Sequence, residues 1–123
     1  MLTGCILAES LRVGAELRFP DMRITRIHRA DVSASASPTQ PKIFTEINFE
    51  APDEYADELA ETLAGALAEG PDWYADFRAG DDHVVIFPGR IFRYSVGDAR
   101  GRAEAVTYGR DLGIPEAQLD WGD

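Results

Sequence analysis

The sequence predicts an α+β fold: an antiparallel sheet in a βββα-βββα order with both helices packed on one face. Three observations predict this class. Six short segments are rich in β-branched and aromatic residues, two longer runs place apolar residues at helical spacing, and turn pairs join neighbouring strands. A chain of 123 residues is the size of one domain, so we expect a single domain over residues 1–123 with a flexible loop at 33–41.

The first three strands are expected between residues 11 and 49. Residues 11–19 place apolar side chains at odd positions, which is the period of a half-buried strand. A Pro-Asp turn follows, and residues 22–32 carry β-branched side chains among arginines, as a returning strand would. The small, polar, proline-bearing segment 33–41 is typical of a loop, and residues 43–49 alternate again.

The period then changes to that of a helix. Behind Pro52, residues 55–67 carry leucine and alanine at helical spacing, and the Gly-Pro pair at 70–71 ends the run. A second helix is expected from residue 98 to residue 112, because it begins at an aspartate suited to cap a helix and ends before Gly113.

Between the two helices, three short strands at residues 73–78, 83–87 and 90–96 form a predicted meander. If residues 88–89 make a two-residue turn and residues 79–82 a four-residue loop, the strand register follows. The expected pairs are Phe87 with Arg90, Val85 with Phe92, His83 with Tyr94, Arg78 with His83, and Asp76 with Val85.

This register separates the meander into two faces. The apolar face should receive the helices and holds Trp73, Ala75, Phe77, Val84, Ile86 and Ile91. The second face is aromatic yet polar and holds Tyr74, Asp76, Arg78, His83, Val85, Phe87, Arg90, Phe92 and Tyr94. With both helices on the first face, the second is too apolar to remain in water and needs a cover. Four candidates for this cover are a second copy of the chain, another protein, a small ligand, and the C-terminal segment with Leu119 and Trp121.

Aromatic and arginine side chains are enriched at protein interfaces. We therefore expect a non-catalytic protein-interaction domain that forms a homodimer or binds another protein through the open aromatic face. The residues expected to bind are Tyr74, Arg78, His83, Phe87, Arg90, Phe92 and Tyr94. The order of elements and the acidity resemble small acidic binding proteins such as secretion chaperones and toxin-immunity proteins, a resemblance of architecture that carries no motif.

The alternative is a binding protein or enzyme for a small anionic ligand that uses the same face. In that hypothesis His83 acts as general acid or base, Asp76 orients it or the substrate, and Arg78 or Arg90 holds an anionic group. The sequence favours the non-catalytic function, because it has no phosphate loop, no dinucleotide fingerprint and no catalytic serine elbow. We expect no cofactor. We also expect no metal, because His28 and His83 lie on different predicted hairpins.

The charge of the chain disfavours several classes of partner. A net charge of -10 repels nucleic acids and anionic membranes, and no run of apolar residues is long enough to span a bilayer. The single cysteine cannot form an internal disulfide, so we expect a cytoplasmic protein.

Charge is also unevenly placed along the chain. The start of the first helix is acidic, which suits the helix dipole or provides a docking surface for a basic partner; the acids are Glu50, Asp53, Glu54, Asp57, Glu58 and Glu61. Arginines gather on the first predicted hairpin, where interleaved acids are typical of a solvated face.

Overall fold

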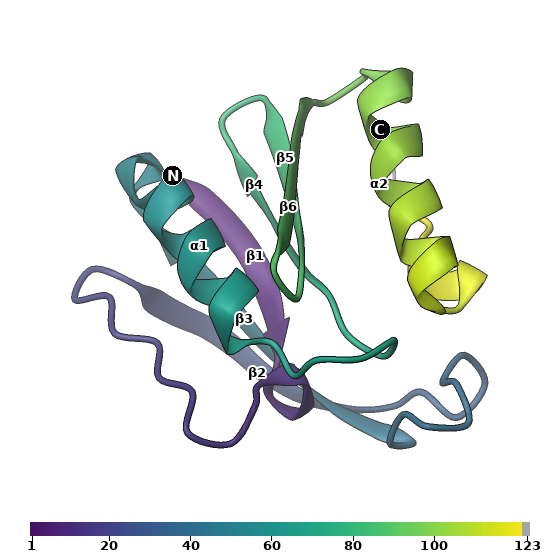
Figure 1. Cartoon of the computed structure of the whole chain (residues 1–123). Helices are drawn as coiled ribbons and strands as arrows, with labels where there is room; N and C mark the ends of the chain where they lie inside the picture. The colour runs from purple at the N-terminus through teal and green to yellow at the C-terminus, as the bar shows by residue number, and fades with distance from the viewer. Residues whose placement is uncertain (122–123) are drawn as a thin grey trace.

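The computed structural model describes residues 1–121 and contains six strands, all paired antiparallel, and two α-helices in the predicted order (Figure 1). The α+β class is therefore confirmed. The sheet order is β2-β3-β1-β4-β5-β6. The elements are β1 Leu2–Leu7, β2 Arg23–Asp31, β3 Ile43–Ala51, α1 Ala56–Ala66, β4 Ala75–Ala79, β5 Asp82–Phe87, β6 Arg90–Ser95 and α2 Ala99–Leu112, with 3-10 turns at Ala8–Ser10, Asp53–Tyr55 and Glu116–Gln118.

The first strand differs from the sequence prediction. It is β1 rather than residues 11–19, which form an irregular connection whose one strand-like contact is the bridge between Leu11 and Leu67. β1 lies at the centre of the sheet, between β3 and β4. Gly4 makes this position possible, because a Cβ there would lie 2.6 Å from the Cβ of Phe77. The alternation at 11–19 has another cause: Leu17 and Phe19 pack against the core from a loop.

The first core lies between α1 and one face of the sheet. Leu59 and Leu63 of α1 are fully buried on side chains from four strands. These strand residues are Leu2, Ile6, Phe49, Ala51, Ala75, Phe77, Ala79, Val84 and Ile86. The predicted apolar face of the meander is thus largely the α1 face, although Ile91 is 38% exposed.

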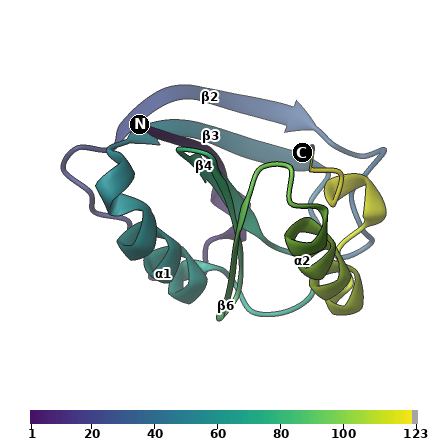
Figure 2. The same ribbon diagram turned by 90° about the horizontal axis from the view of Figure 1, so that it is seen from above.

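The expectation that both helices share one face is wrong. Along β5, Val84 and Ile86 belong to the core beneath α1, whereas Val85 and Phe87 belong to a second core beneath α2. The two helices therefore flank the β4–β6 half of the sheet from opposite sides (Figures 1 and 2). The physical reason is the unbroken apolar run of β5, because such a strand needs cover on both faces.

The C-terminal segment completes the second core. Gly113, with φ 107°, ends α2 in the left-handed conformation that favours glycine. The chain then folds back so that Leu119 and Trp121 are buried against Phe87 and Tyr94. The C-terminal segment, one of the four candidate covers for the aromatic face, therefore covers this face together with α2.

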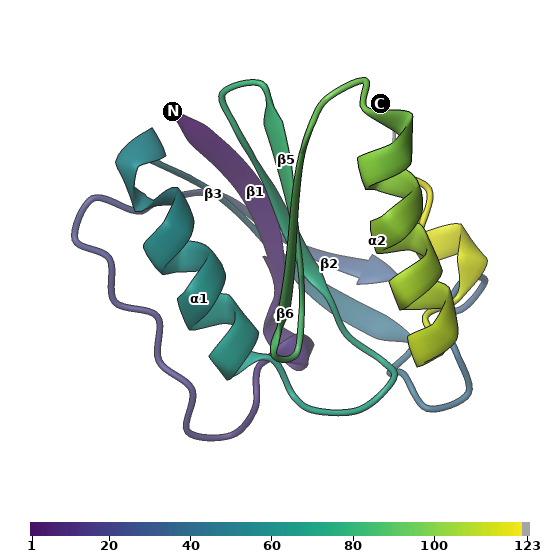
Figure 3. The ribbon, with the colours of Figure 1, turned by 45° about the horizontal axis from the view of Figure 1, so that its top comes forward.

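The opposite half of the sheet has no such cover. β2 has no buried residue, and its register against β3 shifts between Ile24 and Arg26, as at a β-bulge. Figure 3 shows β2 and β3 crossing behind the β5–β6 hairpin at a steep angle. Among the described residues, no helix is long and apolar enough to cross a membrane.

Candidate functional site

All five predicted residue pairs of the meander are confirmed, but the predicted four-residue loop at 79–82 is shorter, because Ala79 pairs with Asp82. Phe87 faces Arg90, Val85 faces Phe92, His83 faces Tyr94, Arg78 faces His83, and Asp76 faces Val85. The residues of the predicted binding face therefore do lie side by side. The expectation that this face is open is wrong, because α2 and the C-terminal segment bury Phe87, His83 and Tyr94. The remaining candidates fall into two separate places.

The first place is a buried chain of hydrogen bonds. His83 is 1% exposed, and its Nδ1 and Nε2 lie 2.7 Å from the Tyr94 hydroxyl and from Asp76 Oδ2. A carboxylate oxygen accepts, so Nε2–H donates to Asp76, and Nδ1 forms a second hydrogen bond with the Tyr94 hydroxyl. Burial raises the pKa of Tyr94, which keeps its hydroxyl available as a donor.

This chain ends at an accessible carboxylate. The Asp76 side chain is 33% exposed, whereas His83 is closed off from solvent. Any ligand on this face would meet Asp76 and would not touch His83. The hypothesis in which His83 performs the acid–base step requires an accessible imidazole. The structure instead exposes the carboxylate of Asp76 and buries His83.

Asp76 lies in a polar trough on the sheet face that α1 does not cover. Two hollows of about 350 and 340 Å³ share Asp76 and Cys5, and we call this combined surface the Asp76 trough. Its first hollow is lined by Thr3, Gly4, Cys5, Thr25, Asn48, Phe49, Glu50, Asp76, Phe77 and Arg78. Cys5 lies between Asn48 and Asp76 in one row across the sheet. No sequence pattern predicts this row, because it depends on the central position of β1.

The trough is poorly suited to a cysteine nucleophile. Burial, reinforced by the nearby charges of Glu46 and Asp76, raises the pKa of the Cys5 thiol to about 11. The thiolate is the nucleophilic form, so Cys5 is almost entirely unreactive thiol near neutral pH. Among residues 1–121, no group of three or more His, Cys, Asp or Glu side chains is placed to hold a metal ion.

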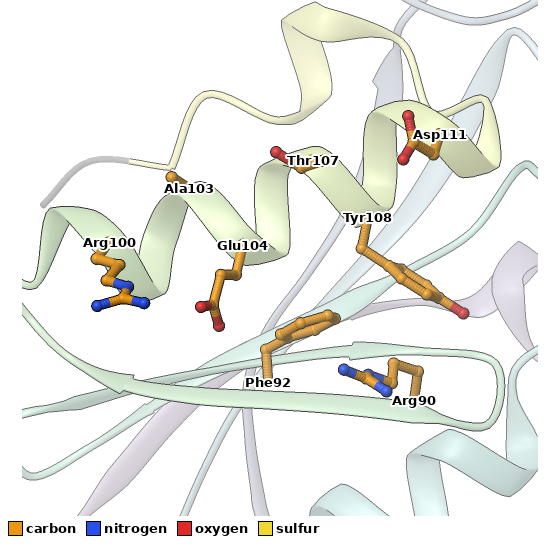
Figure 4. Close-up of a pocket in the computed structure, with 8 residues that line it drawn as sticks. All are labelled: Arg90, Phe92, Arg100, Ala103, Glu104, Thr107, Tyr108 and Asp111. Atoms are coloured by element: carbon orange, nitrogen blue, oxygen red, sulfur yellow. The ribbon is translucent and has the colours of Figure 1, made fainter.

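The second place is a groove between β6 and α2, shown in Figure 4. Arg90 and Phe92 extend from β6 towards Tyr108 of α2, and the Arg90 guanidinium lies 4.8 Å from the Phe92 ring centre and 5.7 Å from that of Tyr108. The groove has a volume of about 480 Å³. Its other lining residues, all from α2, are Arg100, Ala103, Glu104, Thr107 and Asp111. We call it the β6–α2 groove.

This groove runs along a free edge of the sheet. The Val96 amide donates to the Asp81 carbonyl at 2.8 Å, which fixes the hydrogen-bonded pairs between β5 and β6. Pairs alternate in an antiparallel ladder, so Phe92 bonds inward to β5 while the backbone groups of Ile91 and Arg93 point outward. No strand lies beyond them among the described residues.

Helix α1 borders the same edge from the other face. Arg93 contacts Asp57 of α1 at 3.1 Å, and the Gly89 amide donates to the Ala64 carbonyl at 3.0 Å. Figure 2 shows β6 between the two helices. The α1 side is acidic: Asp57, Glu58 and Glu61 are exposed, and no Lys or Arg occurs from residue 43 to residue 77.

Tyr74, the remaining candidate, serves the fold. Its hydroxyl donates to the Gln118 carbonyl at 2.5 Å, and its ring meets that of Trp121 edge-on at 5.3 Å. Gln118 in turn bonds Gln40 of the 33–41 loop. Tyr74 therefore helps to hold the C-terminal return and this loop together.

Comparison of the chain with models of protein families, with curated proteins and with solved structures found no match.

Proposed function

We propose that the protein is a non-catalytic interaction domain that binds an extended polypeptide segment along β6, between α1 and α2. The observation that carries this proposal is the free edge of β6 beside a groove with an aromatic floor. Adding a strand to a sheet edge is a common mode of peptide recognition, in which main-chain hydrogen bonds supply affinity and side-chain pockets supply specificity.

The edge has the chemistry that this mode requires. The outward amides and carbonyls of Ile91 and Arg93 supply the hydrogen bonds. Alternate side chains of an added strand would point into the β6–α2 groove, onto Phe92 and Tyr108. Arg90 and Phe92, two residues of the predicted binding face, would thus contact the bound segment at this margin.

The interaction hypothesis includes self-association and a cytoplasmic location. The free thiol of Cys5, the single cysteine, suits a reducing compartment. The net charge of -10 favours basic protein partners over nucleic acids or anionic membranes.

Ile91→Pro tests the proposal, with Ile91→Ala as the matched control. Proline at this position removes an outward amide and no bond of the β5–β6 ladder, whereas alanine keeps the amide and shortens the same side chain. Native mass spectrometry of each protein, recovered gently from its own source, should show bound polypeptide on the wild type and on Ile91→Ala and none on Ile91→Pro. Equal binding by all three proteins would refute the proposal.

A second candidate function is favoured by the hydrogen-bonded chain from Tyr94 through His83 to Asp76. A small ligand in the Asp76 trough would meet the Asp76 carboxylate, which the buried imidazole of His83 holds in place. It would also meet Arg78 and the buried Oδ1 of Asn48. This Oδ1 accepts no hydrogen bond from residues 1–121. In this hypothesis Asp76 binds the ligand or exchanges a proton with it. The same spectra test it: a small mass retained by the wild type and lost in Asp76→Asn would support it, and its absence from the wild type would count against it.

A further inference from the structure

We infer that the segment bound along β6 is strand β2 of a second copy of this chain, so that copies associate head to tail into one continuous sheet. This inference rests on the proposed function and names the partner for it. Four features of the two edge strands carry it: strand direction, the faces of their side chains, charge and exposed apolar surface.

The directions of the edge strands are compatible. All five pairings in the six-stranded sheet are antiparallel, so β2 and β6, at its two ends, run in opposite directions. A second copy placed beside the first in the same orientation therefore presents its β2 antiparallel to β6. An antiparallel ladder continues across the junction without turning either copy over.

The backbone of β2 is also free on its outer side. The Val32 amide donates to the Lys42 carbonyl at 2.8 Å, and the alternation of pairs then makes His28 bond inward to β3. The backbone groups of Ile27 and Arg29 consequently point outward. They can exchange hydrogen bonds with the outward groups of Ile91 and Arg93.

At this junction the α1 faces of the two copies lie on the same side of the joined sheet. Ile27 pairs with Ile47 on the α1 face, and Ile91 pairs with Ile86 on the same face. Residues opposite each other in a ladder have side chains on one face, so joining the outward residues aligns the α1 faces of both copies. The opposite face of β2, with Arg26 and His28, is then placed beside the β6–α2 groove.

Charge distinguishes the two edges. β2 carries Arg23, Arg26, Arg29 and one histidine, and neither Arg26 nor Arg29 forms an ion pair among the described residues. β6 itself carries Arg90 and Arg93, and Arg93 is paired with Asp57 and Asp82. Acids flank this edge on both sides: those of α1, and Glu104 and Asp111 of α2, which line the groove with Arg90 and Arg100. The overall charge of -10 repels like copies, so placing Arg26 and Arg29 of β2 near the acids that flank β6 favours this orientation over β6 against β6 or β2 against β2.

Apolar surface at both edges would be covered by the same contact. Ile24, Ile27 and Ile91 are 55%, 63% and 38% exposed, and all three lie on the α1 face. Pairing β2 with β6 brings these side chains together across the junction. An exposed edge strand of nine residues also presents a row of unpaired backbone groups that another strand can bind.

A head-to-tail contact leaves one free edge at each end, so association does not stop at two copies unless a ring closes. This property allows a mixing experiment. Ile91→Pro blocks only the β6 edge, and Ile27→Pro blocks only the β2 edge, because both prolines replace outward amides. Arg26→Glu with Arg29→Glu is a second β2-edge variant, which removes the charge complementarity without proline. Ile91→Val is the control, because it keeps both the amide and a β-branched apolar side chain at the junction, and urea unfolding verifies that each protein is folded.

Sedimentation velocity and native mass spectrometry should show oligomers larger than dimers for the wild type and Ile91→Val as concentration rises. Each edge variant should be monomeric alone, and a mixture of Ile91→Pro with either β2-edge variant should form a one-to-one dimer. Self-association of Ile27→Pro alone would reveal a twofold β6 contact, and self-association of Ile91→Pro alone a twofold β2 contact. Either result overturns the inference. A monomeric wild type overturns it too, while leaving the proposed function standing if another polypeptide is bound and Ile91→Pro loses it.

Discussion

The strands β5 and β2 lie in opposite halves of the sheet and differ in how deeply they are buried. In β5, five of six residues are buried between the helices, whereas none of the nine residues of β2 is buried. The reason lies in the residues: β5 contains the unbroken run Val84 to Phe87, and β2 alternates arginines with isoleucine and threonine. The comparison teaches that a strand covered on both faces supplies stability, whereas the edge strands β2 and β6 leave backbone groups available for recognition.

The largest expected effect on stability comes from removing a large apolar side chain from the second core. Phe87 is fully buried and contacts the rings of Tyr74, Phe92, Tyr108 and Trp121. Phe87→Ala should lower the free energy of unfolding by about 3–5 kcal/mol, because it leaves a cavity in the second core. Urea unfolding measures this loss.

Ile24→Ala on β2 is the counterpart of that change. It should cost at most about 0.5 kcal/mol, because more than half of the side chain is already in water. A loss similar to that of Phe87→Ala would show that β2 belongs to the cooperative core.

The two histidines offer the next comparison. His83→Ala leaves Tyr94 and Asp76 without their buried partner, so the free energy of unfolding should fall by about 1–3 kcal/mol. His28 bonds Glu46 between the exposed strand β2 and β3. His28→Ala should therefore change the free energy of unfolding by no more than about 0.5 kcal/mol. Equal effects in thermal or urea unfolding would contradict the division of the sheet.

Two glycines test the packing around β1. Gly4→Ala should destabilise by about 1–3 kcal/mol, because the added Cβ would lie 2.6 Å from Phe77 Cβ and 2.8 Å from the Asp76 carbonyl oxygen. Gly65 lies in α1 with nothing within 4 Å of an added Cβ, so Gly65→Ala should stabilise by up to about 1 kcal/mol. Opposite signs in parallel urea titrations are the expected result, and a neutral Gly4→Ala would contradict the central position of β1.

The smallest expected effect is a dependence on alkaline pH through Cys5. The ordinary pKa of the thiol is 9.0 and its folded value is about 11, so the unfolded chain loses the thiol proton first as pH rises. This contribution to stability is complete below pH 9 and is lost as pH rises to about 11. Cys5→Ala should remove this part of the pH dependence of unfolding. Rapid alkylation of Cys5 by iodoacetamide at pH 8 in the folded protein would contradict the raised pKa.

The sequence allowed the register of the meander to be predicted, because Pro88 and Gly89 set a tight turn and the following pairs are local. It did not reveal β1, since Gly4 and Cys5 break the apolar alternation that marks a strand. It suggested a strand at 11–19, where Leu17 and Phe19 reach the core from a loop. Alternation reports which side chains are buried and cannot distinguish a strand from a loop that packs the same residues.

The position of α2 was missed for a related reason. The strand alternation places Val85 and Phe87 on a face predicted to be open, although four consecutive apolar residues are the pattern of a strand buried on both sides. The Asp76 trough and the β6–α2 groove both join segments far apart in the chain. Neither has a local signal, except that Arg100, Glu104, Tyr108 and Asp111 recur at the spacing of one helix face.

Residue-specific amide exchange in dilute and concentrated solution tests most directly whether the edge strands β2 and β6 bind another strand. In dilute protein the amides of Phe92 and His28, which bond inward, should be protected, while those of Ile91, Arg93, Ile27 and Arg29 should exchange freely. In concentrated protein these four outward amides should become protected together. Unchanged exchange at all four, or new protection confined to the Asp76 trough, would contradict recognition through the edges of the sheet.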